Sequence, residues 1–380
     1  MDLSGTPSYL RLMNRAPWVL ALFVLLGCGA PPVPAEAQEV RRLLYVGTPG
    51  VGGSQELGGA GVLVFDVDLD HAFVRRISLD SATGGTVEPV RGIAAHAGTG
   101  RLYVATTRRM IALDLLTDRI VWESDFGVRC CDRMALAPDG SFMYVPLLGA
   151  NWLVVNAADG SVITTIEKER SAHNTIISDD GRFGYLASQG PVRTISVVDT
   201  RTHEIVRNIG PFGESTRPFT INGRQTLIFV NVNALLGFEV ADLATGRVLH
   251  RVEVPEFPAG RSPIHGIPSH GIGMTADETE IWVTDNANYF MHVFDSTVMP
   301  PVMKASVQLR GEPGWISFGI DGRFAYPATG DVVDVASTRI VATLQDENGR
   351  DVHSEKIVQV DFENGRPVRA SDQFGKGAVR

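Results

Sequence analysis

The chain has little cysteine, no long hydrophobic run and no concentration of positive charge. Three of its 380 residues are cysteines, and two of these, Cys130 and Cys131, are adjacent. With Cys28 assigned to an N-terminal processing site, no disulfide framework can form, so packing must stabilise the fold. The formal charge is -9 and lysine and arginine form no stripe. Nucleic acid is therefore not expected as a partner.

Common enzyme motifs are also missing. The sequence contains no CxxCH haem attachment, no P-loop, no G-x-S-x-G elbow and no Rossmann glycine fingerprint. Whether the protein is an enzyme is left open at this stage.

The N-terminus has the features of an export signal. Arg11 and Arg15 precede the apolar run from Ala16 to Gly27, which is too short to span a bilayer comfortably. "LLGC" at Leu25–Cys28 resembles a bacterial lipobox, whereas "AEA" at Ala35–Ala37 fits a signal-peptidase site. The lipobox is favoured because Gly27 directly precedes Cys28 and the apolar run ends there. We expect a lipoprotein signal peptide at 1–27, a lipid on Cys28 and a flexible tether at 28–40.

This assignment predicts the location of the protein. It would be a periplasmic or outer-membrane lipoprotein, or otherwise a secreted protein, and it would touch the membrane only through its lipid.

A tight turn recurs along the remainder of the chain. The turns end at Gly100, Gly140, Gly181, Gly223, Glu278, Gly322 and Gly365, spaced 40–44 residues apart except for an interval of 55 before Glu278. Each precedes a short apolar strand, and strands with this period are typical of β-propeller blades. The sequence predicts an all-β chain that forms a monomeric seven-bladed β-propeller over 41–372, with a tail at 373–380.

The two ends of the repeat array predict how the ring closes. The first unit starts at Arg41 without an opening strand, and Ser354–Gly365 supplies an opening strand without a blade. We expect this C-terminal strand to complete the first blade, which leaves no open sheet edge.

Several strands resemble a known repeat. "LLYVGT", "RLYVAT" and "IWVTDN", which starts at Ile281, resemble the YVTN-type β-propeller repeats of bacterial exported proteins. The resemblance implies the fold, and it carries over no functional residue because the pattern is a strand signature.

Polar residues gather where the inner strands of the predicted blades begin, at the mouth of the central channel. Counting back eight residues from each turn gives equivalent positions at Gly92, Asp132, His173, Ser215, His270, Gly314 and Ile357, with Arg217 replacing Ser215 if the fifth count shifts by two. The candidate binding residues at this mouth are Arg91, Asp132, Arg133, His173, Arg217, His270, Trp315 and Lys356.

Two histidines share one repeat position, which predicts a metal site. His173 and His270 would converge at the mouth, and His265 could join them from an insertion at Pro255–Pro268. In the alternative interpretation, each histidine bonds to a loop carbonyl or a carboxylate and only fixes the mouth.

A second resemblance concerns "RCCDRM" at Arg129–Met134 and the segment before it. "IALDLLTDRIVW", from Ile111, is similar to the blade motif of pyrroloquinoline-quinone dehydrogenases, matching at Ala112, Asp114, Thr117 and Trp122. The resemblance implies a vicinal disulfide between Cys130 and Cys131 beside a quinone. Because the motif occurs once, we interpret it as shared propeller sequence and do not favour pyrroloquinoline quinone as the cofactor.

Two functions follow from these patterns. The first is a binding module of the cell envelope, whose top face recognises a small ligand or an envelope protein through the insertion and the glycine-rich loop Gly47–Gly61. The alternative is a metal- or quinone-dependent oxidoreductase with its site at the channel mouth.

Overall fold

The computed structural model describes residues 39–50, 54–149, 151–168 and 172–378. These belong to one compact unit, Gln38–Arg380. The expected signal peptide, Cys28 and most of the tether lie outside the described residues. Within the described part of the chain, no helix is both long enough and apolar enough to cross a membrane.

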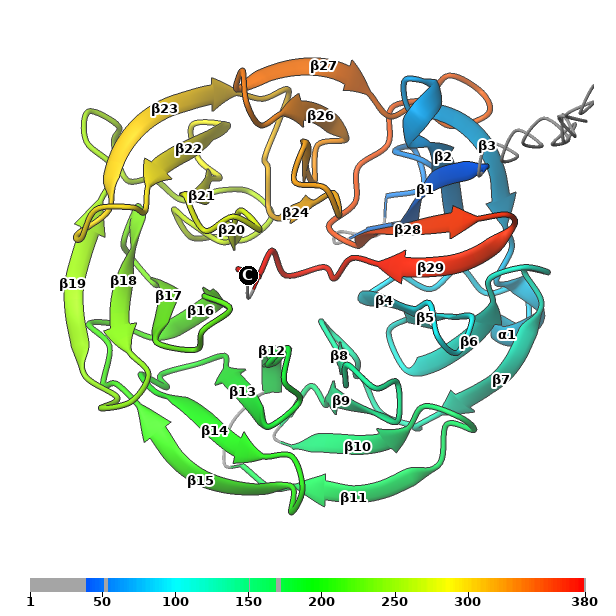
Figure 1. Cartoon of the computed structure of the whole chain (residues 1–380), viewed down its shortest axis with the longest axis horizontal. Helices are drawn as coiled ribbons and strands as arrows, with labels where there is room; N and C mark the ends of the chain where they lie inside the picture. Colours follow the sequence, from blue (N-terminus) through cyan, green and yellow to red (C-terminus); the bar gives the residue numbers. More distant parts are fainter. Residues whose placement is uncertain (1–38, 51–53, 150, 169–171, 379–380) are drawn as a thin grey trace, which may run out of the picture. The chain divides into compact units, whose positions relative to one another are not determined.

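Seven antiparallel sheets are arranged around a central channel, as expected for a seven-bladed β-propeller (Figure 1). From the channel outward, blade one consists of β29 (Arg366–Ala370), β28 (Ile357–Glu363), β1 (Val40–Thr48), β2 (Gly61–Asp66) and β3 (Ala72–Ile77). Blade two consists of β4 (Gly92–His96), β5 (Arg101–Ala105), β6 (Arg109–Asp114) and β7 (Ile120–Asp125). Blade three consists of β8 (Ala135–Leu136), β9 (Phe142–Pro146), β10 (Trp152–Asn156) and β11 (Val162–Ile166).

The other four blades repeat this order. Blade four consists of β12 (Ala172–Ile177), β13 (Phe183–Ser188), β14 (Ile195–Asp199) and β15 (Glu204–Ile209). Blade five consists of β16 (Thr216–Ile221), β17 (Leu227–Val232), β18 (Gly237–Asp242) and β19 (Val248–Glu253). Blade six consists of β20 (Ile272–Met274), β21 (Glu280–Asp285), β22 (Phe290–Asp295) and β23 (Val302–Gln308). Blade seven consists of β24 (Ile316–Phe318), β25 (Phe324–Pro327), β26 (Asp331–Asp334) and β27 (Arg339–Thr343). Blade one also contains the 3-10 helix η1 (Val67–Leu69), and α1 (Asp80–Thr83) leads to blade two.

Sequence patterns explain the place of each strand. The second and third strands of a blade are packed on both faces, and every residue of β21 is buried. The outer strands are half exposed, and β7 alternates partly buried with exposed residues at the period of a strand. At the repeated turns the chain needs a left-handed residue, for example Gly140 with φ 72°.

Residues far apart in sequence close the ring. β28 pairs with β1 in antiparallel register from Val46↔Ile357 to Val40↔Glu363, which confirms that a C-terminal strand completes the first blade. The strand expected after the turn at Gly365, β29, pairs with β28 on its channel side, so this blade alone has five strands.

The segment after β29 crosses the channel (Figure 1) instead of extending beyond the propeller. The Gln373 side-chain amide donates to Met134 O, and the Trp315 indole donates to Gln373 O. Gly375 O accepts from the Thr220 hydroxyl and from Met274 N. The residues expected to form a tail thereby bind several blades at once.

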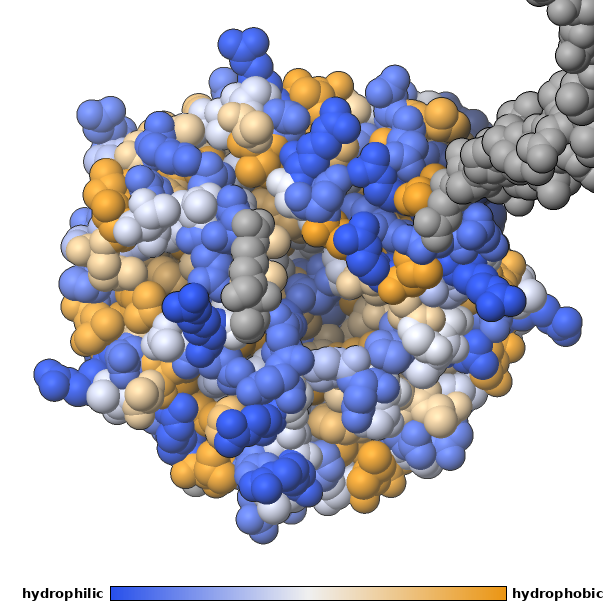
Figure 2. All heavy atoms as spheres, viewed as in Figure 1, coloured by the Kyte–Doolittle hydropathy of each residue, from blue (hydrophilic) through white to orange (hydrophobic). Residues whose placement is uncertain are grey.

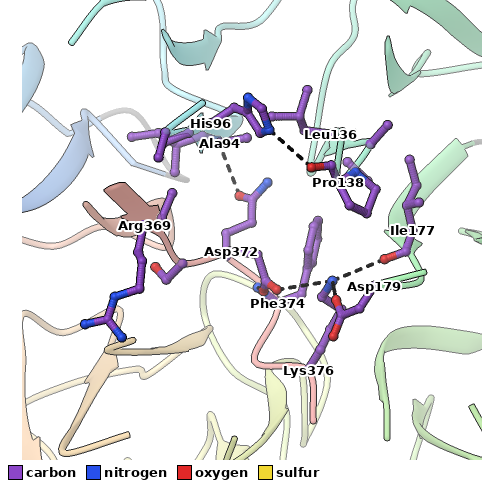
Figure 3. Close-up of a pocket in the computed structure, with 18 of the residues that line it drawn as sticks. Ala94, His96, Leu136, Pro138, Ile177, Asp179, Arg369, Asp372, Phe374 and Lys376 are labelled. Atoms are coloured by element: carbon purple, nitrogen blue, oxygen red, sulfur yellow. Dashed lines mark hydrogen bonds and ion pairs between the residues drawn. The ribbon is translucent and has the colours of Figure 1, made fainter. Parts of the chain in front are cut away.

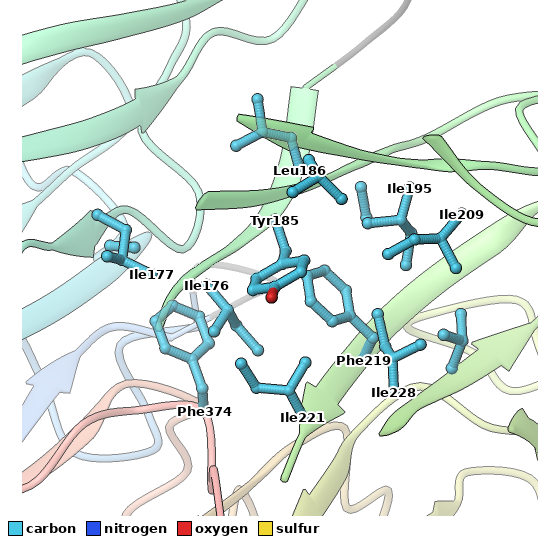
Figure 4. Packing of buried hydrophobic residues seen from close by; sticks show 14 of the residues in the cluster. Ile176, Ile177, Tyr185, Leu186, Ile195, Ile209, Phe219, Ile221, Ile228 and Phe374 are labelled. Carbon is cyan, nitrogen blue, oxygen red and sulfur yellow. The ribbon is translucent and has the colours of Figure 1, made fainter. Parts of the chain in front are cut away.

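Aromatic and aliphatic side chains fill the space between neighbouring blades. In one such cluster, Tyr185 of blade four packs with Phe219 of blade five, and Phe374 reaches it from the channel side (Figure 4). Phe374 is 4% exposed. The segment that crosses the channel is therefore part of the hydrophobic core.

Candidate functional site

Two cavities lie at opposite ends of the inner strands. The larger, about 370 Å³, lies where these strands end and is lined by β4, β8 and the residues after β29. It opens on the face where Figure 2 shows a hollow near the centre of the ring. Its lysine is already paired, since Lys376 Nζ lies 2.6 Å from Asp179 and 3.2 Å from Ile177 O (Figure 3). His96 of this cavity is likewise engaged, with Nε2 3.1 Å from Pro138 O, and Lys376 also lies 3.5 Å from Asp372.

The smaller cavity, about 140 Å³, lies at the channel mouth, where the inner strands begin. Its lining includes Asp132, His173, Arg91 and Cys130. Behind Asp132 and His173 is a set of buried charged and aromatic side chains, and we take the mouth as the candidate site for this reason.

The segment from Cys130 to Arg133 shapes one wall of the mouth. Backbone hydrogen bonds tie it to two blades, from Cys130 N to Thr107 O and from Cys131 N to Pro146 O. The backbone φ angles of Cys131 and Arg133 are 112° and 57°, and residues other than glycine rarely adopt such positive values. The two cysteine sulfurs are joined in a disulfide. This bent backbone directs Asp132 and Arg133 into the mouth.

Arg133 is held between an aromatic ring and a carboxylate. Its guanidinium lies 3.5 Å from the centre of the Trp315 ring, and its Nη2 pairs with Glu355 Oε2. Lys356 Nζ lies 3.3 Å from the same Glu355 oxygen and 3.5 Å from Asp132 Oδ1. Arg133, Glu355 and Lys356 are each no more than 1% exposed.

The insertion before β20 brings His265 over the mouth. The Glu312 carboxylate accepts from the backbone N–H groups of Ile264 and His265, and it lies 2.6 Å from His265 Nδ1. His265 Nε2 lies 2.7 Å from Glu355 Oε1, although the two atoms lack the alignment of a hydrogen bond. His265 is thus placed between two carboxylates.

His270 packs against His265, with ring centres 4.0 Å apart. Its Nδ1 lies 2.8 Å from Gly314 O and donates to it, because a carbonyl can only accept. This fixes the tautomer and leaves the Nε2 lone pair free for a ligand.

One nitrogen of His265, one nitrogen of His270 and one oxygen of Glu355 lie within 4.8 Å of one another. Two imidazoles and a carboxylate are a common protein ligand set for zinc and related ions. Within the described chain, these three residues form the grouping that could hold a metal.

His173 lies beside this group of three residues but is not part of it. Its ring centre is 6.0 Å from that of His270, and its Nε2 lies 3.5 Å from Asp132 Oδ2. The structure therefore brings the three predicted histidines together but places Glu355, instead of His173, among the atoms that converge.

Burial and charge set the protonation of the histidines. Burial lowers the pKa of His173 to about 3, against the attraction of Asp132. Burial, with the neighbouring His265, lowers the pKa of His270 well below its usual value. Burial also opposes the charged form of His265, but Glu355 and Glu312 outweigh it and raise the pKa to about 9. At neutral pH, His265 is an imidazolium and the other two are neutral.

Lys356 and Asp132 are ionised at neutral pH. Burial, with repulsion from Arg133, lowers the pKa of Lys356 to about 8. Burial would raise the pKa of Asp132, but Lys356 and Arg133 outweigh it and lower the pKa to about 2. The mouth is therefore a compact arrangement of opposite charges.

The remaining predicted mouth residues also lie here. Arg91 lines the smaller cavity and accepts at its backbone oxygen from Arg133 N. Arg217 donates to Asn233 Oδ1 at 2.6 Å and acts electrostatically on His173. Of the eight candidate binding residues, Arg91, Asp132 and His173 line the smaller cavity.

Sequence reasoning missed Glu312 and the residues that cross the channel. Glu312 stands two residues before the counted position Gly314, in a loop whose direction the repeat does not define. Glu312 could have been suspected only from the insertion, because a loop that carries a histidine (His265) needs a partner for it, and a nearby carboxylate can supply one.

Comparisons with known proteins support the fold and give no information on function. No protein-family model matches the chain, and no curated protein matches its sequence. The β-propeller domain of Cps50 (Swd1) from Myceliophteria thermophila is similar in structure, with a TM-score of 0.56 and 10% identity over 74% of this chain and 96% of that one. A chain of Kuenenia stuttgartiensis hydrazine synthase gives a TM-score of 0.44 and 16% identity over 66% of this chain and 94% of that one. At such identities the likeness to the Cps50 domain supports a β-propeller, and the chemistry has to be inferred from the mouth.

Proposed function

We propose that this chain is an exported, lipid-anchored β-propeller that binds a divalent transition-metal ion at its channel mouth through His265, His270 and Glu355. One observation carries the metal proposal. Both histidines use Nδ1 for a hydrogen bond to a fixed oxygen, which leaves each Nε2 available, and one nitrogen of each ring lies within 4.8 Å of an oxygen of the buried Glu355.

The surroundings of these side chains are those of metal ligands. Histidine ligands generally donate their second ring N–H to a carboxylate or a backbone carbonyl, which orients the ring. Glu312 and Gly314 O supply these two acceptors. Imidazole with carboxylate suits zinc, and imidazole also suits copper, iron and nickel.

The charge balance also supports a cation. Arg133 and Lys356 repel one, but both are paired with Glu355 or Asp132. In the metal-free protein, His265 lies between Glu312 and Glu355 and is protonated. A divalent ion that replaces this proton adds one net charge to the site.

Three protein ligands leave a coordination position open. The adjacent cavity of about 140 Å³ gives a small ligand room to approach the mouth. Binding of a small ligand beside the metal fits this geometry, and the alternative of a metal-dependent oxidoreductase would use the same open position.

Zinc and cobalt titrations of chelator-treated protein test the proposal. We expect one ion per chain, with cobalt giving the absorption bands of a low-symmetry four-coordinate site. His265→Gln and His270→Gln should each weaken binding by more than about 100-fold, because loss of a second-shell partner alone typically costs about 10- to 100-fold.

His250→Gln is the matched control, since His250 lies on the outer strand β19. Equal affinity in all four proteins, or no stoichiometric metal in any of them, would refute the metal site.

A further inference from the structure

Arg133 is buried with part of its hydrogen-bonding capacity unused. Its side chain is 1% exposed, and among the described residues neither Nε nor Nη1 has a hydrogen-bond partner. A buried donor without a partner costs about 1–3 kcal/mol. Two such donors on one guanidinium indicate that a partner from outside the chain completes this site.

The guanidinium is also held in place before any ligand arrives. It lies on the Trp315 ring, and its Nη2 is paired with Glu355. Its backbone N–H donates to Arg91 O at 3.0 Å. Nε and Nη1 lie on opposite edges of the guanidinium, so either one can donate to a single oxygen of a carboxylate, phosphate or sulfate group while Nη2 stays on Glu355.

A second cation faces the same space. Lys356 Nζ lies 3.5 Å from Asp132 Oδ1, and Arg133 Nε lies 4.0 Å from that oxygen. Both distances exceed those of a charge-assisted hydrogen bond. Asp132 is therefore only a long-range partner of both cations, with its hydrogen bond from Lys356 at 3.5 Å.

The cavity at the mouth reaches Asp132, and Arg133 and Lys356 are buried beside that carboxylate without lining the cavity. Asp132 is 25% exposed at its side chain and lines the cavity together with Arg91 and Arg129. The volume of about 140 Å³ is below the roughly 300–1,000 Å³ typical of sites for drug-sized ligands. The cavity therefore suits a small molecule.

We propose that the channel mouth binds a small oxyanion, a carboxylate or a tetrahedral phosphate- or sulfate-like group, between Arg133 and Lys356. This deepens the proposed function by naming the ligand class at the same mouth. It does not require the metal, because Arg133 and Lys356 meet the oxygens directly. Glu355 connects the two sites, with Oε2 on Arg133 and Oε1 beside His265.

Calorimetric titrations with acetate and with sulfate test the inference, on metal-depleted and on zinc-loaded protein. Arg133→Lys keeps the charge beside Glu355 but loses the Nε and Nη1 donors, so both anions should bind at least about tenfold more weakly. Asp132→Asn removes a like charge beside the anion and should tighten binding by about tenfold. Arg201→Lys is the control, because the Arg201 side chain is 84% exposed.

Each outcome decides the inference. Binding to metal-depleted protein that weakens in Arg133→Lys and tightens in Asp132→Asn supports it, and the preferred probe shows whether the group is planar or tetrahedral. The inference is overturned if neither anion binds, or if Arg133→Lys and the wild type bind with equal affinity. It is also overturned if anion binding requires zinc and neither substitution changes the affinity. If anions bind but zinc does not, the inference stands and the metal proposal fails. Each variant should unfold at the same urea concentration as the wild type, which verifies that it is folded.

Discussion

At the scale of single residues, His265 shows how two carboxylates control one imidazole. Glu312 holds its Nδ1 and Glu355 faces its Nε2, and the side chain is 7% exposed. The folded-state pKa of about 9 lies above the usual value near 6.5. The imidazolium is therefore bound more strongly in the folded chain than in the unfolded one.

This predicts a pH-dependent stability of the metal-free protein. The stabilisation from protonated His265 should be complete below about pH 6.5 and should be lost as the pH rises through 9, at a cost of about 3 kcal/mol. Urea unfolding between pH 6.5 and 9.5 measures it. His265→Gln should lack this loss and His250→Gln should retain it, and an identical loss in His265→Gln would contradict the assignment.

The sequence predicted part of the site because repeats define equivalent positions. His173 and His270 were found in this way, and they do lie 6.0 Å apart across the mouth. The repeat gives a backbone position but no side-chain direction, so it could not show that Glu355 converges with His270 while His173 faces Asp132. Glu312 acts through an insertion, where the repeat pattern is interrupted.

At the scale of elements, the segment after β29 supports the mouth from the opposite side. The Trp315 indole donates to Gln373 O at 2.6 Å, and the face of the same ring carries Arg133. Phe374 anchors this segment in the core between blades. The sequence did not predict it, because its binding partner is a channel that exists only in the assembled ring.

Phe374→Ala tests this support. Removing a buried phenylalanine should lower the free energy of unfolding by about 3–5 kcal/mol, measured with urea. Val368→Ala is the control within the neighbouring β29, since Val368 is 40% exposed, and it should cost less than about 0.5 kcal/mol. Equal stability of both variants would mean that this segment does not stabilise the ring.

At the scale of the whole molecule, the fold was predictable because one turn pattern recurs at 40–44 residues and each copy can be checked against the others. Blade number and ring closure are confirmed by the structure. The proposed lipid on Cys28 belongs to this scale as well, because it would tether the entire propeller to a membrane surface.

Membrane fractionation in a bacterial host tests the tether. Cys28→Ala should move the protein from the membrane to the soluble fraction, because the lipid is the expected anchor. Ala37→Asp blocks the alternative cleavage site and should leave fractionation unchanged. If Cys28→Ala stays with the membrane, the lipobox assignment is wrong.

The pairing of β1 with β28 also determines when the site can exist. Val46 and Ile357 lie at opposite ends of the array of blades, and contacts so distant in sequence are slow to form. Glu355 and Lys356 directly precede β28, so they reach Arg133 in the same step. An incompletely folded chain would therefore lack the mouth altogether, and ligand binding would report that folding has finished.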